Sequence, residues 1–148
     1  MQRFFNTEGP CEPEFHYMVR LYDRLDQIKR LYIDMGKYFV INRGRQYGKT
    51  TTLCALEGYL QEDYYVVSMD FQGISTAEFS DEYTFVRAFL RMFAEAFEDS
   101  GAGMEEVGRV YEFMKQSEKS TLGEMFYLIS GLCKTAGKPV VLLIDEVD

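Results

Sequence analysis

Three short runs of β-branched, aliphatic and aromatic residues stand out from a chain that otherwise spaces its apolar residues as helices do. The runs cover residues 38–42, 64–71 and 140–144; polar residues bound the first two, and the third lies between Pro139 and Asp145. Such runs are typical of β-strands. The last reads Val-Val-Leu-Leu-Ile, the composition of a strand buried on both faces in a parallel sheet. Because helical stretches separate the runs, the sequence predicts an α/β fold with a parallel sheet flanked by helices.

The first 22 residues show no regular apolar spacing. Gly9, Pro10 and Pro13 interrupt this stretch, and such residues break helices and strands. We therefore expect an extended leader over residues 1–22, followed by the core of the domain over residues 23–148. The first helix is expected to begin at Asp23 and to end before Gly36, which has the position of a C-terminal cap. Its apolar stripe consists of Leu25, Ile28, Tyr32 and Met35.

Further helices are expected between the predicted strands. After residue 48, one apolar face consists of Leu53, Leu56 and Leu60. Ser80 is expected to cap a long helix on which a phenylalanine recurs at every fourth position over 85–97, a stripe typical of a buried face. A weaker helical pattern covers residues 107–114. Thr121 and Glu124 have the spacing of a capping box, which predicts the start of the last helix.

The segment after the first predicted strand carries the end of a phosphate-binding loop. It reads Arg43-Gly-Arg-Gln-Tyr-Gly-Lys-Thr50, and its last three residues match the end of the motif G-x-x-x-x-G-K-[ST]. The first glycine of that motif falls on Arg43, whereas the glycine that is present, Gly44, stands one position later. Loop amides at the positive end of a helix would bind a triphosphate. Lys49 would then reach the β- and γ-phosphates, and the Thr50 hydroxyl would coordinate Mg²⁺. The expected nucleotide-binding residues are Gly44, Arg45, Gln46, Tyr47, Gly48, Lys49, Thr50 and Thr51.

Acidic residues stand at the carboxyl ends of two predicted strands. Asp145 and Glu146 follow the apolar run 140–144. In phosphate-loop NTPases the first such acid holds Mg²⁺ through its water shell, and a following glutamate orients the attacking water. Acids can also end a core strand merely because solvent begins there, but the phosphate-loop motif in the same chain favours a nucleotide site. Asp70 and Gln72 end the preceding strand, where a nucleotide contact and a solvated strand end are both compatible with the sequence.

Four segments together resemble the AAA-like ATP-binding domain of bacterial and archaeal proteins. They are Phe5-Asn-Thr-Glu-Gly-Pro10, His16-Tyr-Met-Val19, Gly36 to Leu53 and Lys138 to Asp148. That family belongs to the additional-strand, catalytic-glutamate division of P-loop ATPases. Its loop often reads Pro-Arg-Gln-x-Gly-Lys-Thr, and here Gly44 replaces the proline. The resemblance covers nearly the whole chain and implies a P-loop NTPase fold.

The resemblance also implies that the chain is the N-terminal part of such a domain. In the family, one strand that follows the acids inserts between the phosphate-loop strand and the acid strand, and another covers the far side of the phosphate-loop strand. The sequence stops at Asp148, so we expect a truncated sheet that lacks these central and distal strands. On this interpretation, residues 1–148 bind nucleotide weakly at most and do not hydrolyse it at a useful rate.

The function expected from these motifs is magnesium-dependent binding and hydrolysis of ATP, coupled to an attached domain or partner. Lys49 and Glu146 are the expected catalytic residues, while Thr50 and Asp145 are the expected metal ligands. The alternative is an ATP-gated switch in signalling or defence that binds nucleotide with negligible turnover. A purely structural domain with a relic loop is disfavoured because these four residues are intact.

Composition limits the remaining classes of function. The chain has 148 residues, 47% of them hydrophobic, which suffices for the core of one domain. Its net charge of −8 does not support a nucleic-acid surface, although a protein partner or a C-terminal effector domain is compatible with it. Without a membrane-length apolar run or a signal peptide, a cytoplasmic location is expected. Three cysteines, widely separated, predict reduced thiols rather than disulfides or a zinc site.

Overall fold

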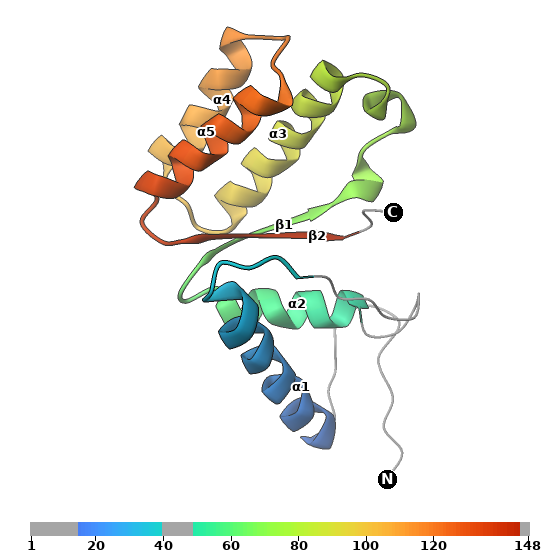
Figure 1. Ribbon diagram of the computed structural model, residues 1–148, viewed down its shortest axis with the longest axis vertical. Helices are drawn as coiled ribbons and strands as arrows, with labels where there is room; N and C mark the ends of the chain where they lie inside the picture. Colours follow the sequence, from blue (N-terminus) through green and yellow to red (C-terminus); the bar gives the residue numbers. More distant parts are fainter. Residues whose placement is uncertain (1–14, 40–48, 146–148) are drawn as a thin grey trace. The chain divides into compact units, whose positions relative to one another are not determined.

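The structure is a computed structural model that describes residues 15–39 and 49–145, with side chains described over 22–39 and 52–145. By its internal contacts the chain divides into two compact units, Met1–Glu62 and Asp63–Asp148. Figure 1 shows the elements of each unit, and the units are described one at a time.

The described part of the first unit contains two α-helices that pack together. Helix α1 spans Phe15–Ile28 and continues as a π-helix, η1, over Lys29–Ile33, while α2 spans Lys49–Leu60. Gly36 ends the first of these with φ of 67°, a left-handed conformation that favours glycine, and its amide donates to the Ile33 carbonyl at 3.0 Å. The predicted glycine cap is therefore confirmed.

Two expectations for this first helix are wrong. The helix begins at Phe15 rather than Asp23, because no proline lies between residues 15 and 33 to interrupt its hydrogen bonding. Its buried stripe also stops early: Leu25 and Ile28 are buried, but 39% of Tyr32 and 64% of Met35 is exposed. The wider turn of η1 changes the spacing after residue 28, so an α-helical stripe cannot continue through it.

The predicted phosphate-loop strand over 38–42 lies mostly outside the described residues. Its described residues, Tyr38 and Phe39, belong to no strand. Helix α2, which follows the loop, buries Leu56 and Leu60 completely and Leu53 in part. The predicted apolar face of α2 is thereby confirmed.

The second unit contains a parallel pair of strands. Strand β1 spans Tyr65–Asp70 and β2 spans Val140–Asp145, in a register that pairs Tyr65 with Val140 and Asp70 with Asp145. The predictions of these two strands and of a parallel sheet are confirmed. Between them lie two 3-10 turns, η2 (Phe71–Gly73) and η3 (Thr76–Phe79), and then α3 (Glu82–Asp99), α4 (Met104–Gln116) and α5 (Leu122–Thr135).

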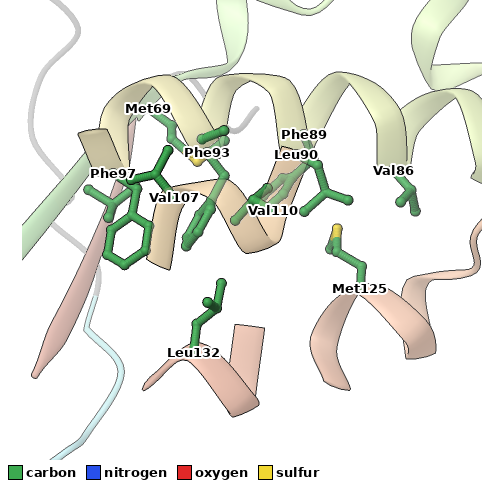
Figure 2. Packing of buried hydrophobic residues seen from close by; sticks show 12 residues of the cluster. Met69, Val86, Phe89, Leu90, Phe93, Phe97, Val107, Val110, Met125 and Leu132 are labelled. Carbon is green, nitrogen blue, oxygen red and sulfur yellow. The ribbon is translucent and has the colours of Figure 1, made fainter. Parts of the chain in front are cut away.

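The phenylalanine stripe of α3 forms the core of this unit. Phe89, Phe93 and Phe97 are buried and contact one another along the helix, with ring centroids 6.4 and 5.4 Å apart. Figure 2 shows the side chains that pack around them from β1, α4 and α5. These are Val67, Met69, Val107, Val110, Met125 and Leu132. One face of the strand pair is therefore covered by α3 and the helices behind it, as the predicted α/β fold requires.

The helix caps of this unit agree with the sequence in one case and differ in another. Thr121 and Glu124 form the predicted capping box, with the Glu124 amide donating to Thr121 Oγ1 at 3.1 Å. The cap of α3, however, is Asp81 rather than Ser80: Asp81 Oδ1 accepts from the Thr84 amide at 3.0 Å. Ser80 instead donates to the Ala77 carbonyl at the end of η3, so the preceding turn occupies it.

No helix in the described ranges is both long and apolar enough to cross a membrane. Mixed α/β structure with a two-stranded parallel sheet is thus what the described residues establish.

Candidate functional site

The phosphate-loop motif meets the start of a helix. Helix α2 begins at Lys49, directly after Gly48, so Lys49, Thr50 and Thr51 form its first turn. The first amides of an α-helix have no acceptor within the helix, and the helix dipole places positive charge there. This turn contains no acidic residue that would repel an anion. The amino-terminal end of α2 is therefore suited to bind a phosphate group.

The rest of the predicted nucleotide site is not described by the structure. Gly44, Arg45, Gln46, Tyr47 and Gly48 lie outside the described residues, as does Glu146. The backbone of Lys49, Thr50 and Thr51 is described but their side chains are not. Their predicted contacts with phosphate and Mg²⁺ stay predictions.

Asp145 lies at the carboxyl end of β2 beside the end of β1. Its register partner is Asp70, so the two acids lie at the same edge of the parallel pair. Val67 and Met69 of β1 belong to the core under α3, and alternation along the strand puts Asp70 and Asp145 on the opposite face. Asp145 is half-buried, whereas Asp70 is exposed and Asp70 Oδ1 accepts from the Gln72 amide at 2.9 Å.

Asp70 and Asp145 have different surroundings at the carboxyl ends of β1 and β2. Asp70 has a structural role, because its side chain caps η2 and turns the chain away from β1. Asp145 ends a strand whose preceding residues are largely apolar, as the magnesium-holding acid of a phosphate-loop NTPase does. Lys49, Thr50 and Thr51 belong to the first unit and Asp145 to the second, so the two halves of the predicted site are described separately.

The donor set predicted for Mg²⁺ is small. Among the described residues no group of three or more His, Cys, Asp or Glu side chains could hold a metal ion. Magnesium in nucleotide sites commonly takes one or two protein oxygens and completes its octahedron with phosphate oxygens and water. A hydroxyl from Thr50 and a carboxylate from Asp145 are hard oxygen donors of that kind, so their chemistry fits this metal.

A buried hydroxyl lies one turn into α2. Only 1% of Thr52 is exposed, and its Oγ1 has no hydrogen-bond partner among the residues that the structure describes. Thr52 follows Thr50 and Thr51 in a run of three threonines, and its burial places it on the face of α2 that also buries Leu56. We therefore assign Thr52 to the packing of α2 and leave it out of the nucleotide site.

The sequence did not reveal one group of polar contacts that joins the first helix to the carboxyl-terminal end of α2. Asp26 and Arg30 of the first helix bond to each other, and Asp26 also bonds to Tyr59 of α2. No local pattern joins residues so far apart in the chain. The cysteines Cys54 and Cys133, on α2 and α5, are free thiols as expected, while Cys11 lies outside the described residues.

Comparisons of the chain with protein-family models, curated proteins and solved structures found no match. The resemblance to the AAA-like ATP-binding domain therefore depends on the sequence motifs themselves.

Replacing Thr52 should stabilise the protein. We expect Thr52→Val to raise the free energy of unfolding by about 1 kcal/mol, because an unpaired buried hydroxyl costs about 1–3 kcal/mol and valine has nearly the same shape. Thr84→Val is the control, since the Thr84 hydroxyl donates to Asp81 Oδ2 at 2.7 Å and its loss should not stabilise. Urea unfolding measures both variants. Destabilisation by Thr52→Val would mean that this hydroxyl has a partner after all.

Proposed function

We propose that this protein binds magnesium-ATP through a phosphate loop and hydrolyses it, and that hydrolysis is coupled to an attached domain or partner. The observation that carries the proposal is the start of α2 at Lys49, the lysine of the motif, immediately after Gly48. A Gly-Lys-Thr triplet inside a strand or in the middle of a helix would not present free backbone amides to a phosphate group. Its position at a helix start is the one that phosphate binding needs.

The chain supplies several positive groups to a triphosphate. Backbone amides from Gly44 to Gly48 would surround the phosphates, while the Lys49 ammonium would neutralise charge on the β- and γ-phosphates. Arg45 lies within the same loop and adds to the positive field. This local charge explains how a chain with a net charge of −8 could bind a polyanion.

Thr50 and Asp145 are the residues that would hold magnesium. When bound, the ion neutralises charge on the phosphate oxygens during transfer. Asp145 is suited to this role by its position at the end of β2, whose register with β1 fixes the strand end. Glu146, the next residue, would orient a water molecule and accept its proton.

Lys49→Ala should weaken magnesium-ATP binding about tenfold or more, because charge-assisted hydrogen bonds contribute about 1.5–3 kcal/mol each. Titration calorimetry on the folded proteins measures this effect. Lys134→Ala, which removes the same charge from the last turn of α5, is the control and should leave the affinity unchanged. Equal affinities for wild type and Lys49→Ala would refute the assignment of the phosphate loop.

In a protein that contains the complete ATPase domain, Glu146→Gln should retain ATP binding and slow phosphate release by about a hundredfold or more, the effect expected when a positioned general base is lost. Multiple-turnover assays measure the rate, and binding of ATP to the same variant is the control. Asp145→Asn should impair magnesium-dependent binding as well. Should the wild type with a complete domain bind ATP with negligible turnover, the protein would be an ATP-gated switch and not an ATPase.

A further inference from the structure

Helix α2 is bonded to the first helix at the end opposite its phosphate-binding turn. We propose that Tyr59 and Asp26 are positioning residues that hold α2 in the orientation needed for nucleotide binding. This inference rests on the function proposed above, and it adds two residues that carry no part of the phosphate-loop motif.

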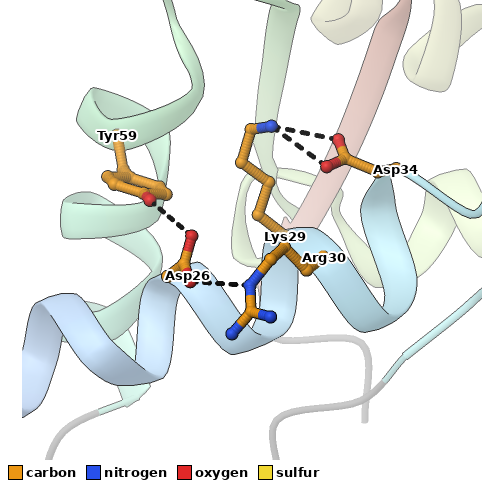
Figure 3. A network of polar contacts seen from close by, with 5 residues as sticks. All are labelled: Asp26, Lys29, Arg30, Asp34 and Tyr59. Atoms are coloured by element: carbon orange, nitrogen blue, oxygen red, sulfur yellow. Dashed lines mark hydrogen bonds and ion pairs between the residues drawn. The ribbon is translucent and has the colours of Figure 1, made fainter.

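The contact consists of two hydrogen bonds that share one carboxylate. Tyr59 Oη donates to Asp26 Oδ1 at 3.1 Å, and Arg30 Nε donates to Asp26 Oδ2 at 2.7 Å. Figure 3 shows the Asp26 carboxylate between the two donors. The Tyr22 ring lies against that of Tyr59, with centroids 6.3 Å apart. Asp26 therefore uses one oxygen to hold its own helix and the other to hold α2.

The ionisation of both groups favours this contact. Hydrogen bonds from Arg30 and then from Tyr59 lower the pKa of Asp26, so it remains a carboxylate acceptor. Burial and the bond to Asp26 raise the pKa of Tyr59, so its hydroxyl remains a donor. Near neutral pH the donor and the acceptor are thus both in the required state.

The contact lies where it can affect the position of the phosphate loop, because it holds one end of the helix whose other end carries the loop. Tyr59 is the penultimate residue of α2 and Lys49 is the first; a helix of these 12 residues is about 18 Å long. The Tyr59–Asp26 bond joins residues 33 positions apart, and the segment enclosed between them contains the whole loop from Gly44 to Thr50. The bond therefore restrains both segments that flank the loop.

A second set of contacts strengthens the segment on the amino-terminal side. Lys29 Nζ pairs with Asp34 Oδ2 at 3.1 Å, and the Asp34 amide donates to the Lys29 carbonyl at 2.8 Å. These bonds close the π-helical segment η1, which begins three residues after Asp26 and includes Arg30.

Release of Tyr59 would not leave Asp26 without a partner. Arg30 stands four residues after Asp26 on the same helix, and their ion pair needs nothing from α2. Removing the Tyr59 hydroxyl should thus change the orientation of α2 more than the stability of the first helix. This difference separates a positioning role from a purely structural one.

Tyr59→Phe tests the proposal because it removes only the hydroxyl. We expect it to weaken magnesium-ATP binding about fivefold, the low end of the coupling between linked sites, with little change in melting temperature. Tyr22→Phe retains the ring contact and is the matched control, expected to bind as the wild type does. Asp26→Asn, which retains an acceptor for Tyr59, should bind ATP more tightly than Asp26→Ala.

The outcomes separate this inference from the proposed function. If the wild type does not bind magnesium-ATP in calorimetry, the proposed function and the positioning role are both refuted. If it binds and Tyr59→Phe binds equally well, or loses melting temperature without losing affinity, the positioning role alone is refuted. Should Tyr59→Phe fail to fold, the comparison of Asp26→Asn with Asp26→Ala decides, and equal affinities of these two would overturn the inference.

Discussion

The packing of α3 against β1 is the interaction on which the second unit depends. Phe93 and Phe97 are almost completely buried, and each buried side chain of this size contributes about 1.5–3 kcal/mol. The same stripe contacts apolar side chains from α4 and α5, so three helices are held to one face of the strand pair. Through β1 this packing also fixes β2, and hence the position of Asp145 at the edge of the sheet.

Where a structural feature depends only on residues close together in the chain, the sequence predicted it well. The apolar run of β2, the run of β-forming residues in β1 and the four-residue spacing from Phe89 to Phe97 each depend on neighbouring residues, and each formed as expected. The capping box of Thr121 and Glu124 is likewise a contact within one helical turn. Local patterns of this kind need no knowledge of the rest of the fold.

Other features depend on competition between neighbouring residues for one position, or on how helices pack. The sequence did not predict these features. Asp81 and Ser80 are both good caps, and only the preceding 3-10 turn decides between them. The π-turn after Ile28 has no sequence pattern distinct from that of an α-helix, so the exposure of Tyr32 and Met35 was not foreseen. The Tyr59–Asp26 bond joins two helices and follows from how they pack.

For the candidate site, the sequence contains the motif, and the structure describes the helix start and the strand end that belong to it. The start of α2 at Lys49 and the end of β2 at Asp145 are the positions that a phosphate loop and its magnesium-holding acid would need. The predicted site consists of polar residues, and the sequence indicates their chemical roles because each residue type binds few kinds of group. Their arrangement in space cannot be read in that way, since it depends on how loop, helix and strand ends meet.

The central claim is that the amino-terminal end of α2 binds the phosphates of a nucleotide. Backbone amide NMR tests it most directly, by comparing the shifts that magnesium-ATP and adenosine cause in the isotope-labelled protein. The account predicts that magnesium-ATP shifts the amide resonances of Gly44 to Thr51 and that adenosine, which lacks phosphate, leaves them largely in place. Shifts confined to other residues, or no shifts with magnesium-ATP, would contradict it.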